Sequence, residues 1–304
     1  MPFRFYFFFI ITTFFFLFSP GQNPYFQIIA FNRELFFQKH ITPSITIHPI
    51  PYVNADVIPP LVSAQGAYIV DLSSFTPVFK KNPDKHFFPA STTKIITALV
   101  AADVYKPDDV ITISNVAVEG QKMDLIDGEQ ITAENLLYGT LVHSGNDAAY
   151  ALANFYGYEA FIKLMNIKAQ KLGMKNSYFT NPAGLDNYRQ KSTPFDLALA
   201  GRALIENPYL RKMVGTKEII IFDTKYSISH KLTNVNKLLG EIQGLGGLKT
   251  GYTENAGENL VSFYRHEDHD YLIVVMNSKD RFIDTTTLIN WIKDQVKYLS
   301  IDVS

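Results

Sequence analysis

The chain has 304 residues, of which 47% are hydrophobic and 19% charged, and its 28 basic residues nearly balance 29 acidic ones. This composition is typical of a globular protein and excludes a chain that is disordered throughout. A net charge of −1 provides no basic footprint for nucleic acid, which needs clustered cations to neutralise phosphates. The absence of cysteine excludes disulfides, thiolate metal sites and cysteine nucleophiles.

The N-terminal segment predicts an exported protein. No charged residue occurs between Arg4 and Arg33, and the run over 5–18 is almost entirely aromatic or aliphatic. As a helix this run spans roughly 21 Å, which is short for a hydrocarbon core of ~30 Å but fits the apolar region of a signal peptide. No clear cleavage site follows at Ser19–Gln22, so residues 1–22 are either a signal peptide or an uncleaved signal anchor.

A proline-rich stretch follows the apolar segment. Five prolines fall between residues 43 and 60, and they prevent a regular helix and favour an extended backbone. We therefore expect residues 23–61 to form a linker and residues 62–304 to form the folded domain.

The folded region shows apolar, β-prone runs and longer segments of helical periodicity. Capping residues support the helices, with Thr193 as an N-cap and Gly173 as a C-cap. In chain order we expect strands at 67–72 and 76–79, helices at 91–102, 133–142, 147–156, 159–172 and 193–207, strands at 219–222, 260–264 and 271–276, and a helix at 285–299. This order predicts an α+β protein whose helices are partly inserted into the chain path of a sheet.

Ser91 and Lys94 form the first motif with chemical meaning. They are three residues apart, nearly one helical turn, so both side chains lie on one face of the expected helix. A serine hydroxyl is a poor nucleophile without a base beside it, and burial in an apolar helix can lower the pKa of a lysine enough to make it that base. The ordinary alternative is a helix-capping serine followed by a surface lysine.

Two further short motifs lie where side chains can reach a cleft. Ser144–Asn146 (Ser-Gly-Asn) falls between two expected helices, and Lys249–Gly251 (Lys-Thr-Gly) begins an expected strand after a glycine-rich run. Taken singly, the first is also an ordinary interhelical turn and the second an edge strand with a bulge. In the order Ser-x-x-Lys, Ser-Gly-Asn, Lys-Thr-Gly, the three motifs match the signature set of penicillin-binding proteins and β-lactamases.

Over about residues 62–300 the sequence resembles the D-alanyl-D-alanine carboxypeptidase family of low-molecular-weight penicillin-binding proteins. The likeness extends to Pro89–Leu99, His143–Ala149, Asn181–Asp186, Gly247–Thr253 and Ala256–Gly257. The resemblance implies an α+β fold in which an antiparallel β-sheet is flanked by helices and carries an inserted all-helical subdomain. Many members add a β-rich domain and an anchoring helix after this region, for which the chain leaves no length. We therefore expect any membrane attachment to come from the N-terminal segment.

The resemblance also implies an activity, that of a serine-type D-Ala-D-Ala carboxypeptidase. Such an enzyme removes the terminal D-alanine from peptidoglycan stem peptides through an acyl-serine intermediate, and β-lactams such as penicillin inhibit it by acylating the same serine. Ser91 would be the nucleophile, Lys94 would accept its proton, and Ser144 would relay a proton to the departing amine. Residues 62–304 would then be the catalytic domain of an exported bacterial protein at the outer face of the cytoplasmic membrane, in the periplasm or in the cell wall.

The same resemblance assigns the substrate-binding residues. Asn146 would hold Lys94 and the substrate amide, and Lys249 with Thr250 would bind the free carboxylate of the peptide. Gly251 would let the substrate backbone lie along the strand as an added strand. The backbone N–H groups of Ser91 and Tyr252 would form the oxyanion hole.

Two other functions stay open. A β-lactamase uses the same nucleophile with fast deacylation, for which class A enzymes position water through a glutamate; residues 181–187 contain no glutamate. A catalytically silent cell-wall-binding homologue would be expected to lack a motif residue, and all are present.

The polar run His266–His269 does not predict a metal site. Its two histidines are three residues apart in an expected hairpin turn, whereas a metalloprotease pair needs positions i and i+4 on a helix. We expect a solvated turn here, and neither a metal nor another cofactor. The expected partners are a stem peptide ending in D-Ala-D-Ala and β-lactam inhibitors, with no nucleic acid.

Overall fold

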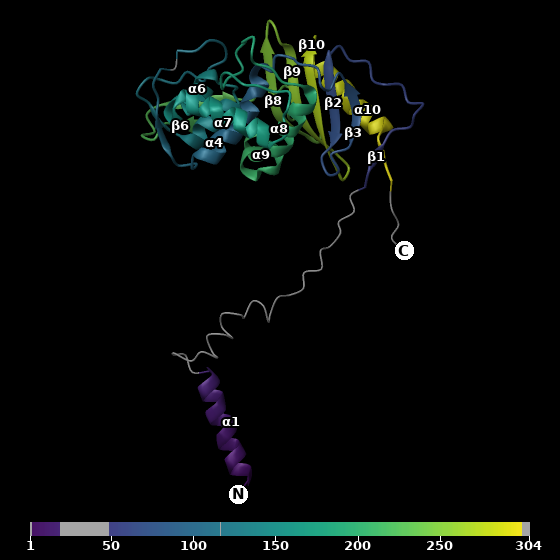
Figure 1. Ribbon diagram of the computed structural model, residues 1–304. Helices are drawn as coiled ribbons and strands as arrows, with labels where there is room; N and C mark the ends of the chain where they lie inside the picture. The colour runs from purple at the N-terminus through teal and green to yellow at the C-terminus, as the bar shows by residue number, and fades with distance from the viewer. Residues whose placement is uncertain (1, 19–48, 116, 300–304) are drawn as a thin grey trace. The chain divides into compact units, whose positions relative to one another are not determined.

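The computed structural model describes residues 2–18, 49–115 and 117–299 (Figure 1). The chain divides into two compact units, residues 1–47 and residues 48–304. Each is described by itself below.

In the first unit, α1 (Pro2–Phe18) is a 17-residue helix whose described side chains, from Arg4 to Phe15, are mostly exposed. Within the described ranges, no helix is both long and apolar enough to cross a membrane. The end of the predicted signal segment, residues 19–22, and the greater part of the predicted linker, residues 23–48, lie outside the described residues.

The centre of the second unit is a five-stranded antiparallel sheet of order β3-β2-β10-β9-β8 (Figure 1). Its strands are β2 (Gly66–Asp71), β3 (Pro77–Lys81), β8 (Leu245–Thr253), β9 (Gly257–His266) and β10 (His269–Ser278). β2 is buried at every residue and β10 at six consecutive residues. Burial of both faces explains why these strands are continuous apolar runs in the sequence and do not alternate with polar residues.

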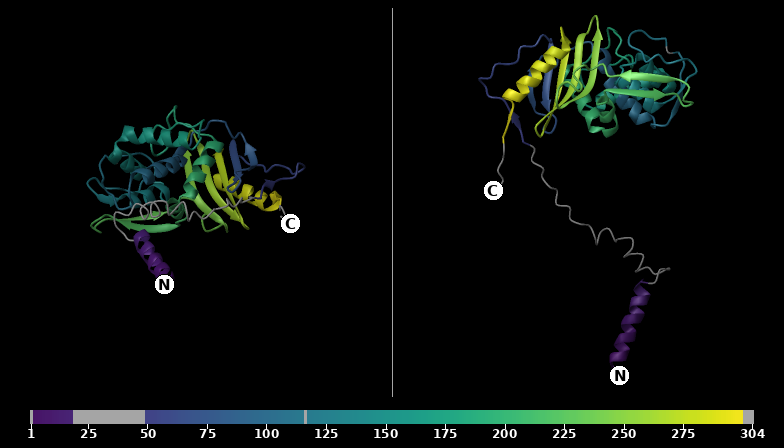
Figure 2. Two further views of the ribbon diagram at one scale, coloured as in Figure 1. Left: turned by 60° about the horizontal axis from the view of Figure 1, so that its bottom comes forward. Right: turned by 180° about the vertical axis from the view of Figure 1, so that it is seen from behind.

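Helices cover both faces of this sheet (Figures 1 and 2). Neighbouring residues of a strand point to opposite faces, so on β10 Leu272 belongs to the larger core cluster and Ile273 to the smaller one. The larger cluster includes α8 (Pro194–Glu206), and the smaller one includes α10 (Arg281–Gln295). The sheet is therefore the middle layer of three.

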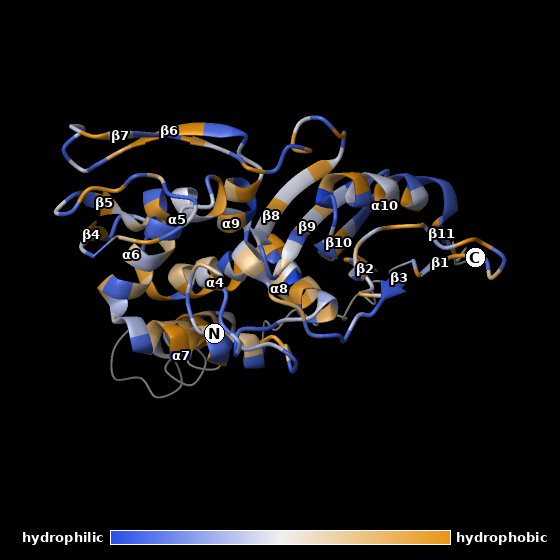
Figure 3. Cartoon of the chain, turned by 90° about the horizontal axis from the view of Figure 1, so that it is seen from above, coloured by the Kyte–Doolittle hydropathy of each residue, from blue (hydrophilic) through white to orange (hydrophobic). Residues whose placement is uncertain are grey.

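The other described helices of this unit come from the chain between β3 and β8 and form a helical region beside the sheet (Figure 3). They are the 3-10 turn η1 (Ala90–Thr93), α4 (Lys94–Val104), α5 (Ala133–Leu141), α6 (Asn146–Tyr156), α7 (Tyr158–Lys171) and α9 (Pro208–Val214). Two ribbons border them, β4 (Val110–Thr112) with β5 (Gln130–Thr132) and β6 (Glu218–Phe222) with β7 (Ser229–Thr233). The predicted α+β fold, an antiparallel sheet with an inserted helical region, is confirmed.

The closing helix differs from its prediction at both ends. It was expected over 285–299, but α10 begins at Arg281 because the Asp280 carboxylate accepts hydrogen bonds from the N–H groups of Phe282 and Ile283. The helix ends at Gln295, and the chain then becomes extended.

This extended segment pairs with part of the predicted linker, which therefore belongs to the folded unit. β11 (Lys297–Tyr298) pairs antiparallel with β1 (Pro51–Tyr52), and Leu299 N–H donates to the Ile50 carbonyl. Residues 50–52 were expected to be linker because they lie within the stretch of five prolines between residues 43 and 60. Their pairing depends on a strand at the other end of the chain, which local sequence does not reveal.

We predict that Asp284→Ala lowers the free energy of unfolding by about 2–4 kcal/mol, because several buried donors would lose their acceptor. The Asp284 carboxylate, on α10, accepts hydrogen bonds from the N–H groups of Ser63 and Ala64 and from the hydroxyls of Ser63 and Ser278. Urea unfolding measures the change. Asp294→Ala, at an exposed position of the same helix, is the control and should change stability by less than about 0.5 kcal/mol. Equal stability of the two variants would contradict this role.

Candidate active site

Ser91 lies in a tight turn that the central sheet holds in place. The helix expected to start here begins instead as the 3-10 turn η1, and α4 begins only at Lys94. The buried side chain of Asn259 on β9 donates hydrogen bonds to the carbonyl oxygens of Phe88 and Pro89, at 2.9 and 3.1 Å. The backbone that leads into Ser91 is thereby bound to the sheet.

Two glycines let neighbouring segments approach this turn. A Cβ on Gly251 of β8 would lie 2.9 Å from the Ser91 amide nitrogen. A Cβ on Gly184 would lie 1.8 Å from the Ala90 carbonyl oxygen, and Gly184 also has a φ of +87°. Any side chain at these positions would push the segments apart, so glycine is required for the close approach.

The amine of Lys94 is buried among three oxygen atoms. Its Nζ lies 2.9 Å from Ser91 Oγ, 2.7 Å from Asn146 Oδ1 and 2.8 Å from the Ala183 carbonyl oxygen. The residue has no exposed surface. Three chain segments, α4, the start of α6 and the loop at Ala183, therefore meet at this one nitrogen.

Burial changes the acid–base properties of both lysines of the site. Desolvation, followed by the positive charge of Lys249, holds the pKa of Lys94 well below its usual value of 10.5, and Asp147 opposes this shift. Desolvation and the nearby positive charge of Arg281 lower the pKa of Lys249 to about 7. Both effects favour the neutral amine.

The Ser144–Asn146 segment links the helical region to β8. Ser144 adopts a positive φ of 62°, and its Oγ lies 2.8 Å from the Lys249 Nζ. Asn146, the first residue of α6, has its amide oxygen at Lys94 and donates from its side-chain nitrogen to the Glu119 carbonyl. The Ser-Gly-Asn motif is thus hydrogen-bonded to both other motifs, to Ser-x-x-Lys through Lys94 and to Lys-Thr-Gly through Lys249.

These side chains open into a cavity of about 430 Å³. Its lining includes the predicted residues Ser91, Ser144, Asn146, Thr250, Gly251 and Tyr252. Lys94 and Lys249, which are 0% and 1% exposed, are not part of the lining and reach it through the hydroxyls of Ser91 and Ser144. Tyr252 is 60% exposed. All eight residues predicted for the site therefore lie in one place.

The structure adds groups that sequence reasoning did not identify. Arg281, the first residue of α10, also lines the cavity and donates from Nη1 to the Gly251 carbonyl at 3.0 Å. Glu119–Gln121 form another part of the wall, and the Ala183 carbonyl contacts Lys94. No recognisable sequence signal marks Arg281, because it lies 30 residues beyond the Lys-Thr-Gly motif. The same is true of the Ala183 carbonyl, because every residue has one.

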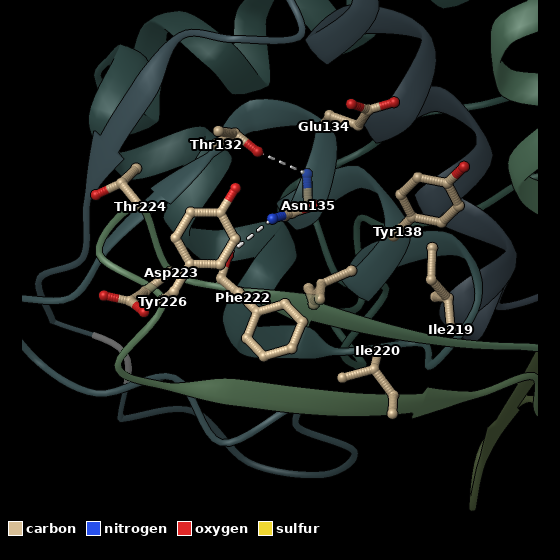
Figure 4. A pocket seen from close by; sticks show the side chains of 11 residues that line it. Thr132, Glu134, Asn135, Tyr138, Ile219, Ile220, Phe222, Asp223, Thr224 and Tyr226 are labelled. Atoms are coloured by element: carbon tan, nitrogen blue, oxygen red, sulfur yellow. Dashed lines mark hydrogen bonds between the residues drawn. The ribbon is translucent and has the colours of Figure 1, made fainter.

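A second cavity, of about 520 Å³, lies between α5 and the strand β6 (Figure 4). Its wall combines the α5 side chains of Glu134, Asn135 and Tyr138 with residues 219–222 of β6. The Asn135 side chain donates to the Phe222 carbonyl at 2.9 Å, which attaches the β6–β7 ribbon to α5 (Figure 4). None of the eight predicted site residues lines this cavity.

The run His266–His269 is a tight turn between two strands. Pairing of β9 with β10 continues to His266 opposite His269, so the turn is shorter than the one expected over 265–270. Across the described part of the chain, no group of three or more His, Asp or Glu side chains is arranged to hold a metal ion.

Residues 54–280 match the model of the D-alanyl-D-alanine carboxypeptidase family, peptidase family S11. DacC of Escherichia coli (strain K12), described as a D-alanyl-D-alanine carboxypeptidase, is 34% identical over 253 residues, which cover 76% of this chain and 62% of that protein. DacF of Bacillus subtilis (strain 168), with the same description, is 31% identical over 243 residues, covering 75% and 61%. The chain therefore spans about three fifths of the length of these curated relatives.

A solved structure has a similar fold. The crystal structure of the Streptomyces K15 DD-transpeptidase is 31% identical, with a TM-score of 0.73, and the match covers 77% of this chain and 98% of that chain. The family match spans the central sheet, the helical region and all three motifs. The chain belongs to the D-alanyl-D-alanine carboxypeptidase family of serine peptidases.

Proposed function

We propose that this protein is a serine-type D-Ala-D-Ala carboxypeptidase that removes the terminal D-alanine from peptidoglycan stem peptides and is acylated by penicillin. The observation that carries the proposal is the 2.9 Å contact between the buried Lys94 amine and the Ser91 hydroxyl at the edge of an open cavity. The descriptions of the relatives as carboxypeptidases support the substrate class.

The contacts of Lys94 favour proton transfer from Ser91. A neutral amine has two N–H donors and one lone pair. The Asn146 amide oxygen and the Ala183 carbonyl oxygen can only accept, so they take both N–H groups. The lone pair is then left for the third neighbour, the Ser91 hydroxyl at 2.9 Å, which would donate to the neutral amine. Ser91 is thereby activated as a nucleophile by an adjacent base.

In the proposed acylation, Ser91 Oγ attacks the carbonyl carbon of the peptide bond between the two D-alanines as its proton passes to Lys94. The Ser91 and Tyr252 N–H groups would stabilise the oxyanion, a contribution of about 2.7–4 kcal/mol for each donor. The C–N bond then breaks, and the proton held by Lys94 would be relayed through Ser144 to the leaving amine, which returns Lys94 to its neutral form. A water molecule would then attack the acyl-enzyme as its proton passes to Lys94. The ester bond breaks, Ser91 Oγ takes that proton back, and the shortened peptide leaves.

Three groups would bind the terminal carboxylate of the peptide. At the cavity wall Arg281 supplies positive charge and Thr250 a hydroxyl donor, and Lys249, buried just behind the wall, adds a charge once it is protonated. Because a bound anion favours the charged amine, binding of the carboxylate would raise the pKa of Lys249 above its value of about 7 in the free protein.

The decisive test is covalent labelling by penicillin. The wild-type protein should gain the mass of one penicillin on the tryptic peptide that contains Ser91, and Ser91→Ala should not, because the hydroxyl that Lys94 activates would be missing. The measurement is mass spectrometry of the intact and digested protein. Ser229→Ala, at an exposed position of β7, is the control and should label as the wild type does. Labelling of the Ser91→Ala variant at another residue would overturn the assignment.

We further infer that residues 1–22 direct export and place the catalytic unit at the outer face of the cytoplasmic membrane, in the periplasm or in the cell wall. The apolar helix α1, with Arg4 as its described basic residue, supports this inference.

Fractionation of bacterial cells tests export. The full chain should reach the membrane or periplasmic fraction and be accessible to added protease, whereas a chain that begins at residue 49 should stay in the cytoplasm. The N-terminal sequence of the exported protein would distinguish a cleaved signal from an anchor. Retention of the unprocessed full chain in the cytoplasm would contradict export.

A further inference from the structure

His230 on β7 is a buried side chain that uses both of its ring nitrogens. Its Nδ1 lies 2.9 Å from the Met123 carbonyl oxygen, and its Nε2 lies 2.9 Å from Glu129 Oε1. The other oxygen of Glu129 accepts the N–H of Ile126 at 3.1 Å. His230 and Glu129 are 7% and 4% exposed. This pair joins the β6–β7 ribbon to the segment over 123–129.

The chemistry of these contacts makes each residue of the pair depend on the other. The Met123 carbonyl can only accept, so Nδ1 of His230 must carry a proton. A second proton must lie between Nε2 and Glu129, on one atom or the other. A buried polar group that loses such a partner is left unsatisfied, so neither residue can be removed without a cost to the other.

The segment held by this pair continues into the wall of the active site. Met123 N–H donates to the buried carboxylate of Asp147. Gly120 and Gln121, three and two residues before Met123, line the cavity. The Gln121 carbonyl accepts the N–H of Asn146 at 2.7 Å. The wall segment and the start of α6 are therefore hydrogen-bonded at several points.

Asn146 connects this wall to the reacting groups. Its side-chain nitrogen donates to the Glu119 carbonyl, which orients its amide oxygen toward the Lys94 amine. Hydrogen bonds, together with the backbone of the wall segment between Glu119 and Met123, thus connect His230 through Asn146 to Lys94 and Ser91. The β6–β7 ribbon is fixed to α5, because Asn135 donates to the Phe222 carbonyl (Figure 4). It is also fixed to β5, because Thr224 N–H donates to the Gln130 carbonyl.

We propose that His230 and Glu129 are positioning residues for acylation: by holding the wall segment over 119–129, they keep Asn146 in the orientation that directs the lone pair of Lys94 at Ser91. This inference rests on the proposed function. Neither side chain lines the cavity, so their effect passes through Asn146 and not through contact with substrate. The effect should fall on the acylation step more than on binding of the terminal carboxylate, since Lys249 and Thr250 belong to β8.

The experiment compares variants that break the pair with one that preserves its geometry. His230→Phe keeps a planar ring but removes both hydrogen bonds, and Glu129→Ala removes the carboxylate. Glu129→Gln is the conservative variant: its amide N–H can donate to Nε2 of a neutral His230, and its amide oxygen can still accept from Ile126. Ile292→Val in α10, within the smaller core cluster, is the control for a modest loss of stability.

The measurements are the rate of penicillin acylation, kcat and KM for a peptide ending in D-Ala-D-Ala, and the Tm of each full-length variant. His230→Phe and Glu129→Ala should lower the acylation rate and kcat by about tenfold or more and change KM by less than about threefold, because a small displacement of a catalytic group is costly. Glu129→Gln should retain the wild-type rate within about threefold, and Ile292→Val should lower Tm without changing the rate.

The outcomes separate this inference from the function on which it rests. Failure of penicillin to label the wild type would refute the proposed function itself. Labelling of the wild type together with unchanged acylation in His230→Phe and Glu129→Ala would refute only the positioning role. Equal loss in Glu129→Gln and Glu129→Ala, or a loss in Ile292→Val that follows its Tm, would also refute it. Should His230→Phe fail to fold, the two Glu129 variants still decide the question.

Discussion

The site depends on the burial of one amine, Lys94, among three oxygen atoms that belong to different parts of the chain. Burial makes the neutral form of the amine favourable, and two acceptors that cannot donate leave its lone pair for the Ser91 hydroxyl. Neither condition exists in the isolated α4 segment. The base is created only when the sheet, the start of α6 and the Ala183 loop come together around it.

Desolvation lowers the pKa of both Lys94 and Lys249, but the two amines have different roles in the proposed mechanism. Lys94 and Lys249 both lose water on folding, and each positive charge in this small buried region disfavours the next. The two amines are nevertheless in contact with different serines, Ser91 and Ser144. In the proposed mechanism Lys94 acts as a base, and Lys249, near Arg281, can recover its charge when a carboxylate binds.

Much of the fold could be predicted from local sequence. The apolar runs that became β2, β9 and β10 and the capped helix α8, with Thr193 accepting from the Asp196 N–H, are governed by neighbouring residues. Two segments were predicted wrongly, one because its partner strand is distant in the sequence and one because a helix cap was overlooked. The β1–β11 pairing joins the two ends of the folded unit, and the early start of α10 depends on the Asp280 cap, which precedes the apolar pattern from which that helix was predicted.

For the candidate site, the residue types and the order of the three motifs could be predicted from the sequence, because Ser91, Lys94 and Lys249 carry distinctive side chains. That their atoms meet, that Arg281 joins them, and that the Ala183 and Glu119 carbonyls orient them became apparent only in the folded chain. Every residue has a backbone carbonyl, so the role of a particular carbonyl depends on where the fold places it. The same applies to burial, which sets the protonation of both lysines and belongs to the assembled molecule.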